Sequence, residues 1–175
     1  MPDRAVELAK NIKLLVLDVD GVLTDGGLYY DDHGLAMKRF HVLDGLGIKM
    51  AQAVGLEIGV ITGLNQKPVE ARINELGVSR YIAGTHDKIT FFKEMCAQVG
   101  VSPSQTAFMG DDLLDFAPMK AAGLAMAVPN AVPEIIETAD WVSTRQGGQG
   151  AVREAVDFIL DARGLKAEAT KKWVI

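Results

Sequence analysis

The sequence has little cysteine, no excess of positive charge and no long apolar run, and each shortage excludes a class of protein. Cys96 is the only cysteine among 175 residues, which excludes an internal disulfide and a cysteine-based zinc cluster and favours a reducing compartment. Eighteen Lys and Arg against 23 Asp and Glu give a net charge of -5, so a nucleic-acid partner is not expected. No run approaches the roughly 18 apolar residues of a membrane span.

The first residues also lack a targeting signal. Met1 to Lys13 carries charges of both signs and has no apolar core of the kind found in a signal peptide. We therefore expect a cytoplasmic protein that binds neither nucleic acid nor membrane.

What the sequence does contain predicts one folded domain. Apolar residues make up 49% and charged residues 23%, as in an average globular domain. A chain of this length can bury roughly 70% of its unfolded surface in a single core. We expect one domain over residues 1–175, with a β-hairpin at about 26–41 and a C-terminal tail at about 165–175.

Short apolar runs alternate with helical patterns along the chain, which indicates a parallel sheet covered by helices on both faces. The fold class is predicted to be α/β, with a doubly wound, mostly parallel, Rossmann-like sheet. The expected strands are Leu14 to Val19, Glu57 to Ile61, Tyr81 to Ala83, Thr106 to Met109, Leu124 to Val128 and an edge strand at Trp141-Val142. The expected helices are Asp44 to Val54, Pro68 to Leu76, Lys88 to Val99, Leu113 to Ala122, Pro133 to Thr138 and Ala151 to Arg163.

Two carboxylates lie at the end of the first predicted strand. Alternation places Asp18 and Asp20 on the same side, and two carboxylates about 4 Å apart repel by roughly 4 kcal/mol at an effective dielectric of 20. A divalent cation such as Mg²⁺, which prefers carboxylate oxygens, would relieve that repulsion. An EF-hand is excluded, because Val22, Leu23 and Tyr29 stand where that calcium loop needs an acidic or amide residue, Gly and Glu.

Three further polar sites follow later strands, and each has an ordinary interpretation beside the functional one. Thr62 ends a strand, where a hydroxyl is often a turn former. Lys88 lies in the first turn of a helix, where its charge opposes the helix dipole. The last site is Gly110-Asp111-Asp112 with Asp115, in which Asp112 could simply cap a helix.

The four segments in this order resemble the haloacid-dehalogenase-like phosphatase superfamily. Asp18-Val19-Asp20-Gly21-Val22-Leu23-Thr24 is similar to its first motif, Thr62 to the second, Lys88 to the third and Gly110-Asp111-Asp112-x-x-Asp115 to the fourth. The hairpin region, the segment Phe40 to Gly45 and the late Gly147 to Glu154 resemble the small capless phosphatases of 3-deoxy-D-manno-octulosonate 8-phosphate. Relatives of those enzymes act on nonulosonate phosphates of the sialic acid type.

The resemblance implies a role for each motif residue. Asp18 would be the nucleophile that forms an aspartyl phosphate, and Asp20 the general acid and then the base. Mg²⁺ would be held by Asp18, the main-chain oxygen of Asp20 and Asp111, with Asp112 and Asp115 keeping those ligands in place. Thr62 and Lys88 would hold the phosphoryl oxygens.

The resemblance also implies contacts with the sugar acid, beyond Asp20 and Lys88. The expected contact residues are His41, Val42, Leu43, Asp44, Gly45, Lys49 and Arg72. A loop histidine at position 41 and a solvated lysine at position 49 are the ordinary alternatives. One position departs from the family pattern, because Leu64 stands where the octulosonate enzymes typically carry Arg after the Thr-Gly of the second motif.

Two other classes of protein fit less well. A phospho-acceptor receiver module also uses carboxylates, Thr and Lys on a doubly wound sheet, but its acceptor Asp lies on a later strand and no late Gly-Asp-Asp follows. A sugar-nucleotide transferase with an Asp-x-Asp metal site would need a nucleotide-binding region before the motif, and only about 13 residues precede the first strand.

The spacing of the motifs leaves no room for a cap domain. About 40 residues separate Asp20 from Thr62 and about 25 separate Thr62 from Lys88, and the strands and helices of the core use up both stretches.

The predicted hairpin is apolar, with Leu28, Tyr29, Tyr30 and Phe40, a pattern typical of interaction surfaces. In the family such hairpins build a homotetramer in which each subunit covers its neighbour's site. We therefore expect a tetramer whose residues Lys166 to Ile175 are flexible unless docked on a neighbour through Trp173. The alternative is a disordered tail and a hairpin packed on its own domain.

Overall fold

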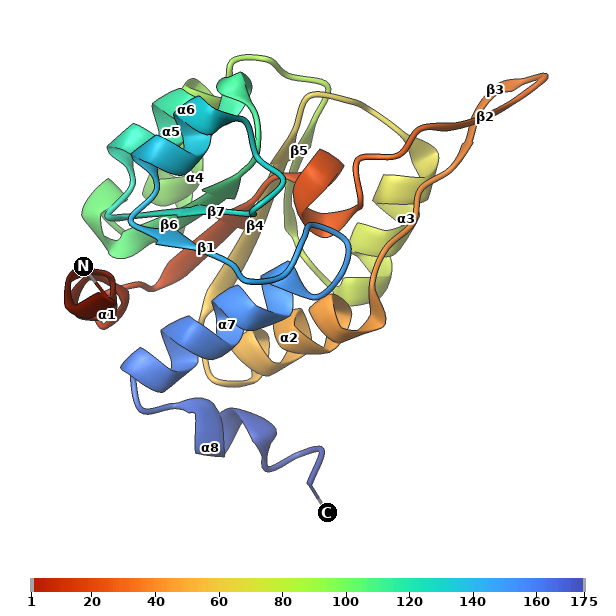
Figure 1. Cartoon of the computed structure of the whole chain (residues 1–175). Helices are drawn as coiled ribbons and strands as arrows, with labels where there is room; N and C mark the ends of the chain where they lie inside the picture. Colours follow the sequence, from red (N-terminus) through yellow and green to blue (C-terminus); the bar gives the residue numbers. More distant parts are fainter. Residues whose placement is uncertain (1, 175) are drawn as a thin grey trace.

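Six parallel strands form the centre of the computed structural model, which describes residues 2–174 (Figure 1). Their spatial order is β5-β4-β1-β6-β7-β8. The strands are β1 (Leu14–Leu17), β4 (Glu57–Thr62), β5 (Arg80–Ala83), β6 (Thr106–Gly110), β7 (Leu124–Ala127) and β8 (Trp141–Val142). Because β1 pairs in parallel with both β4 and β6, the ends of these three strands meet at one edge of the sheet, where ligand sites of such folds lie.

Helices cover both faces of the sheet, as the sequence predicts. They are α1 (Pro2–Ala9), α2 (Val42–Ala53), α3 (Lys67–Leu76), α4 (Lys88–Val99), α5 (Phe116–Ala121), α6 (Pro133–Thr138), α7 (Ala151–Ala162) and α8 (Lys166–Thr170). One buried cluster joins α1, α2, α3, α7 and α8 to one face, and a second joins α4, α5 and α6 to the other. Successive residues of β1 fall into different clusters, since side chains alternate along a strand.

A two-stranded antiparallel hairpin leaves the body after the first motif (Figure 1). It consists of β2 (Tyr29–Asp31) and β3 (Gly34–Met37), and a bridge between Thr24 and Phe40 closes its stem. Three of its apolar side chains are exposed, with Tyr29 at 41%, Tyr30 at 69% and Met37 at 58%. These side chains therefore do not pack on the domain that carries them. In the described chain the stretch from Asp20 to Thr62 holds this hairpin and α2, and no cap domain is inserted.

The structure corrects the predicted ends of two helices. The helix expected from Leu113 is a short helical turn, Leu113–Asp115, followed by α5, because Pro118 lies in the first turn of α5, where its missing N–H is not needed. The helix expected to be capped by Asp44 begins at Val42, because the side chain of His41 accepts a hydrogen bond from the backbone N–H of Leu43.

The two ends of the described chain are more ordered than the sequence indicates. No helix is among the elements predicted before Leu14, yet α1 buries Ala5 and Ala9 against the core. The tail was expected to be flexible unless docked on a neighbour, but α8 packs on α2 and α7 of its own chain and buries Ala169. No helix between residues 2 and 174 is long and apolar enough to cross a membrane.

Candidate active site

The first motif forms a tight turn at the end of β1. After Asp18 the chain makes an irregular helical turn, Val19–Leu23, in which Gly21 has a φ of +92°. A Cβ atom on Gly21 would lie 2.0 Å from Oδ2 of Asp111. Glycine is therefore required here both for the positive φ and for the close approach of the carboxylate that follows β6.

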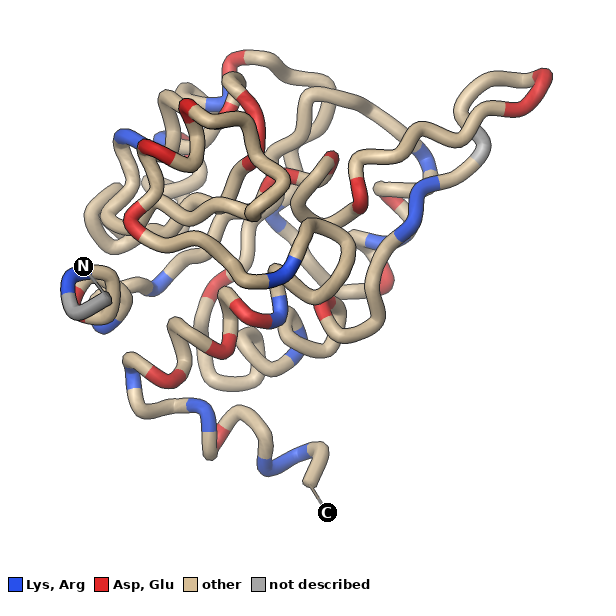
Figure 2. Tube along the Cα trace, in the orientation of Figure 1, with Lys and Arg blue, Asp and Glu red and all other residues tan. Residues whose placement is uncertain are grey.

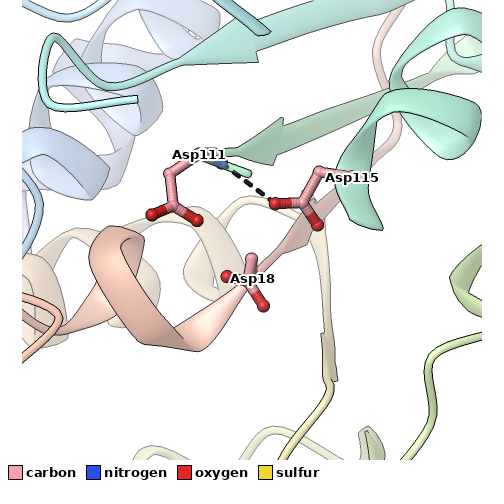
Figure 3. A group of neighbouring side chains, drawn as sticks. All are labelled: Asp18, Asp111 and Asp115. Carbon is pink, nitrogen blue, oxygen red and sulfur yellow. Dashed lines mark hydrogen bonds between the residues drawn. The ribbon is translucent and has the colours of Figure 1, made fainter. Parts of the chain in front are cut away.

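Three carboxylates converge at the carboxyl edge of the sheet. Carboxylate oxygens of Asp18, Asp111 and Asp115 all lie within 4.8 Å of one another (Figure 3). Oδ2 of Asp115 accepts hydrogen bonds from the backbone N–H groups of Asp111, at 3.0 Å, and Asp112, at 3.3 Å. Asp115 thus fixes the backbone of the loop that presents Asp111.

Lys88 supplies the positive charge within this cluster. Its Nζ donates to Oδ1 of Asp18 at 2.6 Å and to Oδ1 of Asp115 at 2.7 Å, and the residue is buried. Burial disfavours the ammonium, but the two carboxylates outweigh that effect and the pKa of Lys88 is raised. The predicted lysine is therefore a charged partner of the predicted nucleophile.

One ammonium does not balance three carboxylates. Burial, followed by the charge of Asp115, raises the pKa of Asp18 well above its ordinary value. Burial, followed by Asp115 and Asp112, raises the pKa of Asp111 to about 7. A further positive charge at this point would stabilise the ionised form of both carboxylates.

The donor set fits a hard divalent cation such as Mg²⁺, which takes carboxylate oxygens. Both oxygens of Asp115 are already in hydrogen bonds with the chain, so Asp18 and Asp111 are the carboxylates suited to the metal. Asp112 is exposed and accepts from the backbone N–H of Leu113 at 2.7 Å. This hydrogen bond holds the loop after β6, so Asp112 supports the metal ligands and is not one of them.

Asp20, the predicted general acid, has a partner that the sequence analysis missed. Nζ of Lys38 lies 2.5 Å from Oδ1 of Asp20, and the Lys38 side chain has no exposed surface. Lys38 follows β3 directly, at the stem of the hairpin, where Figure 2 shows basic residues. No spacing pattern links positions 20 and 38, so sequence reasoning had no signal for this pair.

A cavity of about 200 Å³ opens over the cluster. Six of the predicted residues border it, namely Asp18, Asp20, Lys88, Asp111, Asp112 and Asp115. Gly63, Leu64, His86 and Leu114 complete its lining. Thr62 is buried and does not border the cavity. Its hydroxyl accepts a hydrogen bond from the backbone N–H of Leu64 at 3.4 Å. Its predicted contact with a phosphoryl oxygen stays a prediction.

The predicted sugar-acid contacts do not line this cavity within one chain. His41, Val42 and Leu43 begin α2, and Val42 is 76% exposed. Arg72 reaches from α3 to the start of α2, where a Cβ on Gly45 would lie 2.3 Å from its Nη2. These residues stay predictions as substrate contacts.

Two of the predicted contacts lie away from the cavity of their own chain and stay predictions as substrate contacts. Asp44 is buried, and its Oδ1 accepts from the backbone N–H of Arg153 at 2.8 Å, so it caps α7. Burial raises the pKa of Asp44. The Nζ atom of Lys49 lies near Gly77, 3.5 Å from where a Cβ would be, at the end of α3 away from the cavity.

A clamp formed by Asn130 and the glycine-rich loop 145–150 holds the catalytic turn. Nδ2 of Asn130 donates to the Gly21 carbonyl at 3.1 Å, and its Oδ1 accepts from the Gly147 N–H at 2.8 Å. The Gly148 N–H donates to the carbonyl of Val22 at 3.0 Å. The glycine-rich segment is visible in the sequence itself, but Asn130 was missed.

Comparisons with known proteins agree with this geometry. Residues 80–155 match the model of the haloacid dehalogenase-like hydrolase family. The 3-deoxy-D-manno-octulosonate 8-phosphate phosphatase KdsC of Escherichia coli K12 is 42% identical over 161 residues, which cover 92% of this chain and 86% of that protein.

Two solved structures are similar over nearly the whole chain. A putative hydrolase of the same superfamily, subfamily III A, from Legionella pneumophila has a TM-score of 0.95 and 41% identity, covering 98% of this chain and 94% of that one. The 3-deoxy-D-manno-octulosonate 8-phosphate phosphatase of Moraxella catarrhalis, solved with magnesium, phosphate and KDO, has a TM-score of 0.94 and 36% identity, covering 98% of each chain.

Proposed function

The chain belongs to the 3-deoxy-D-manno-octulosonate 8-phosphate phosphatases of the haloacid dehalogenase-like hydrolases, and on that premise we propose that it removes the phosphate from this sugar acid. It is a magnesium-dependent phosphoric monoester hydrolase. The observation that carries the proposal is the Asp18 carboxylate, held by Lys88 beside Asp111 at the floor of an open cavity.

The reaction proceeds in two steps on this chain's own residues. An oxygen of Asp18 attacks phosphorus, and the bond from phosphorus to the sugar oxygen breaks as Asp20 gives its proton to that oxygen. Asp20 then takes a proton from water, which hydrolyses the aspartyl phosphate and frees Asp18. When bound by Asp18, Asp111 and the main-chain oxygen of Asp20, magnesium offsets the negative charge of the carboxylates and the phosphate.

Lys88 and Asp115 prepare the nucleophile for attack. Lys88 holds one oxygen of Asp18, which leaves the other to face the cavity, and Asp115 holds Lys88 from the opposite side. The Lys88 charge also attracts the phosphoryl oxygens. Thr62 would assist from the end of β4 if its hydroxyl turned toward the cavity.

Leu64 favours a second candidate substrate, a nonulosonate 9-phosphate of the sialic acid type. Leu64 borders the cavity and is 41% exposed, so an apolar side chain stands where the octulosonate enzymes typically place Arg. A sugar acid other than the octulosonate would suit the part of the cavity that Leu64 lines. The receiver alternative has no support, because the relatives of this chain are hydrolases.

We also propose a cytoplasmic homotetramer in which the hairpin meets another subunit. Leu28, Tyr29, Tyr30 and Met37 expose between 41% and 69% of their surface on a ribbon that leaves the body. An exposed apolar ribbon of this kind is typical of an interface. Trp173, at 38% exposure, is the proposed anchor of the tail on a neighbour.

The function is tested by phosphate release from a panel of substrates in the presence of magnesium. The panel contains 3-deoxy-D-manno-octulosonate 8-phosphate, a nonulosonate 9-phosphate, hexose phosphates, phosphoserine and nucleotides. We expect the octulosonate ester to give the highest kcat/KM and the Asp18→Asn variant to give none. A higher kcat/KM for the nonulosonate would favour the second candidate, and a preference for nucleotides or phosphoserine would overturn both.

A further inference from the structure

Lys38 is a buried lysine whose charge the proposed mechanism does not use. Its side chain has no exposed surface, although it lies at the stem of an exposed hairpin. Among residues 2–174, Asp20 is the one acidic side chain within ion-pair distance of its Nζ, at 2.5 Å. A buried ammonium is costly unless a carboxylate accompanies it, so the fold retains Lys38 together with Asp20.

Of the two paired residues, Asp20 borders the cavity and Lys38 does not. The Asp20 side chain is 26% exposed and borders the cavity, whereas Lys38 is enclosed and cannot touch a substrate. Lys38 therefore acts on the reaction only through Asp20. Because Lys38 occupies Oδ1, the carboxyl group of Asp20 is restricted in rotation and its other oxygen is left for the cavity.

We propose that Lys38 is a positioning residue that orients the carboxyl group of Asp20 for proton transfer to the leaving oxygen. A general acid must lie within hydrogen-bond reach of the atom it protonates, so its orientation affects the rate directly. The proton passes from Asp20 to the sugar oxygen as the bond between that oxygen and phosphorus breaks. This inference rests on the proposed function, since it takes Asp20 to be the acid.

The pair also connects the hairpin to the site. Lys38 follows β3 without an intervening residue, and the next pairing of the stem is the bridge between Thr24 and Phe40. A displacement of the hairpin stem would therefore move the group that holds Asp20. This gives the hairpin a catalytic consequence in addition to any contact it makes with a neighbouring subunit.

Two substrates with different leaving groups can distinguish a positioning role of Lys38 from a purely structural one. An alkoxide needs a proton to depart, whereas p-nitrophenolate departs without one. If Lys38 positions the acid, its loss slows hydrolysis of an alkyl phosphate more than that of p-nitrophenyl phosphate. A residue that only stabilised the fold would affect both substrates equally.

The test compares kcat/KM, which reports only the steps up to the aspartyl phosphate, for the octulosonate 8-phosphate and p-nitrophenyl phosphate in wild type and Lys38→Met. We expect kcat/KM to fall at least about tenfold for the sugar ester and less than about threefold for the aryl ester, since general acids contribute about 10²–10⁴. Lys38→Gln, which is one bond shorter and polar, should shift the ratio in the same direction and serves if Lys38→Met does not fold. The control is Lys166→Met, which removes the exposed pair with Asp161 and should change neither substrate.

A double-mutant cycle completes the test. In the Asp20→Asn background, Lys38→Met should cause no further loss that is selective for the sugar ester. Equal losses for both substrates, no loss at all, or a selective loss that persists in the Asp20→Asn background would overturn the inference. If wild type hydrolyses p-nitrophenyl phosphate but not the octulosonate ester, the proposed substrate fails separately, and Lys38 is tested with the fastest alkyl phosphate of the panel.

Discussion

Gly147 lies so close to the carbonyl of Gly21 that a Cβ atom on Gly147 would stand 1.6 Å from the oxygen. Asn130 joins the same two residues by hydrogen bonds. The backbone of loop 145–150 therefore rests directly on the turn that carries Asp20. This contact connects a glycine in the loop after β8, the last strand, to the catalytic residues that follow β1 at the centre of the sheet.

Gly147→Ala should displace the catalytic turn, because the new methyl group clashes with the backbone of Gly21 and Thr24. We expect kcat to fall at least tenfold and the free energy of unfolding to fall by about 1–3 kcal/mol. Gly164→Ala is the control: Gly164 has a φ of +68° with open space around it, so the variant should lose stability but keep its kcat. Wild-type kcat in Gly147→Ala would contradict the role of the clamp.

Asp18→Asn should abolish turnover while the fold is kept, because the amide has nearly the same shape but is no nucleophile. Phosphate release from p-nitrophenyl phosphate measures the loss, and circular dichroism checks the fold. Asp161→Asn removes a carboxylate from an exposed ion pair and should have full activity. A kcat within tenfold of wild type for Asp18→Asn would exclude Asp18 as the nucleophile.

Magnesium affinity should weaken as the pH falls below 7. The metal-free chain has an Asp111 pKa of about 7, so below that pH a proton occupies the carboxylate and the metal must displace it. One displaced proton predicts about a tenfold rise in Kd for each pH unit below 7, measured by calorimetry, with proton release visible in buffers of different ionisation heat. Excess EDTA should stop turnover and added magnesium should restore it. An affinity that does not change between pH 6 and 8 would contradict the raised pKa.

Leu64→Arg should lower the KM for the octulosonate 8-phosphate. Leu64 borders the cavity, and a guanidinium there could form a charge-assisted hydrogen bond of roughly 1.5–3 kcal/mol with the sugar acid, about a tenfold change or more in KM. Leu113→Arg adds the same charge at an exposed position that does not border the cavity, and should leave the KM unchanged. An unchanged or raised KM in Leu64→Arg would mean that another group already binds the acid.

Tyr29→Ser combined with Tyr30→Ser should dissociate the proposed tetramer. Both tyrosines lie exposed on the hairpin, where an interface would bury them. Light scattering should give four times 18.8 kDa for wild type and a smaller mass for the variant. Ile136→Ser, an apolar-to-polar change on α6, is the control and should stay assembled. Wild type near 18.8 kDa with full activity at nanomolar concentration would exclude a shared site.

The convergence of Asp18, Lys88, Asp111 and Asp115 could be predicted from the sequence because topology determines it. Each residue follows a strand or opens a helix of one parallel sheet, and the ends of neighbouring parallel strands meet at the same edge. The sheet, the hairpin and most helices follow from periodicity in the same way.

The partners that hold these residues could not be predicted in this way. The pairs Asn130 with Gly21 and Asp44 with Arg153 each span 109 residues, and both depend on how irregular loops close over the sheet. Asp44 has the sequence pattern of a cap for its own helix, but the chain uses it to cap α7. Local sequence patterns indicate which residues begin a helix or strand. They do not indicate which distant backbone groups the side chains of those residues contact.

The clamp on the catalytic turn has a consequence for the time course of biosynthesis. A nascent chain that has emerged as far as β7 already carries Asp18, Asp20, Lys88 and Asp111. Asn130 and loop 145–150, which fix the turn, are translated only afterwards. Most of the acidic cluster is therefore synthesised before the residues that fix the catalytic turn, and we expect phosphatase activity only from chains that extend beyond residue 150.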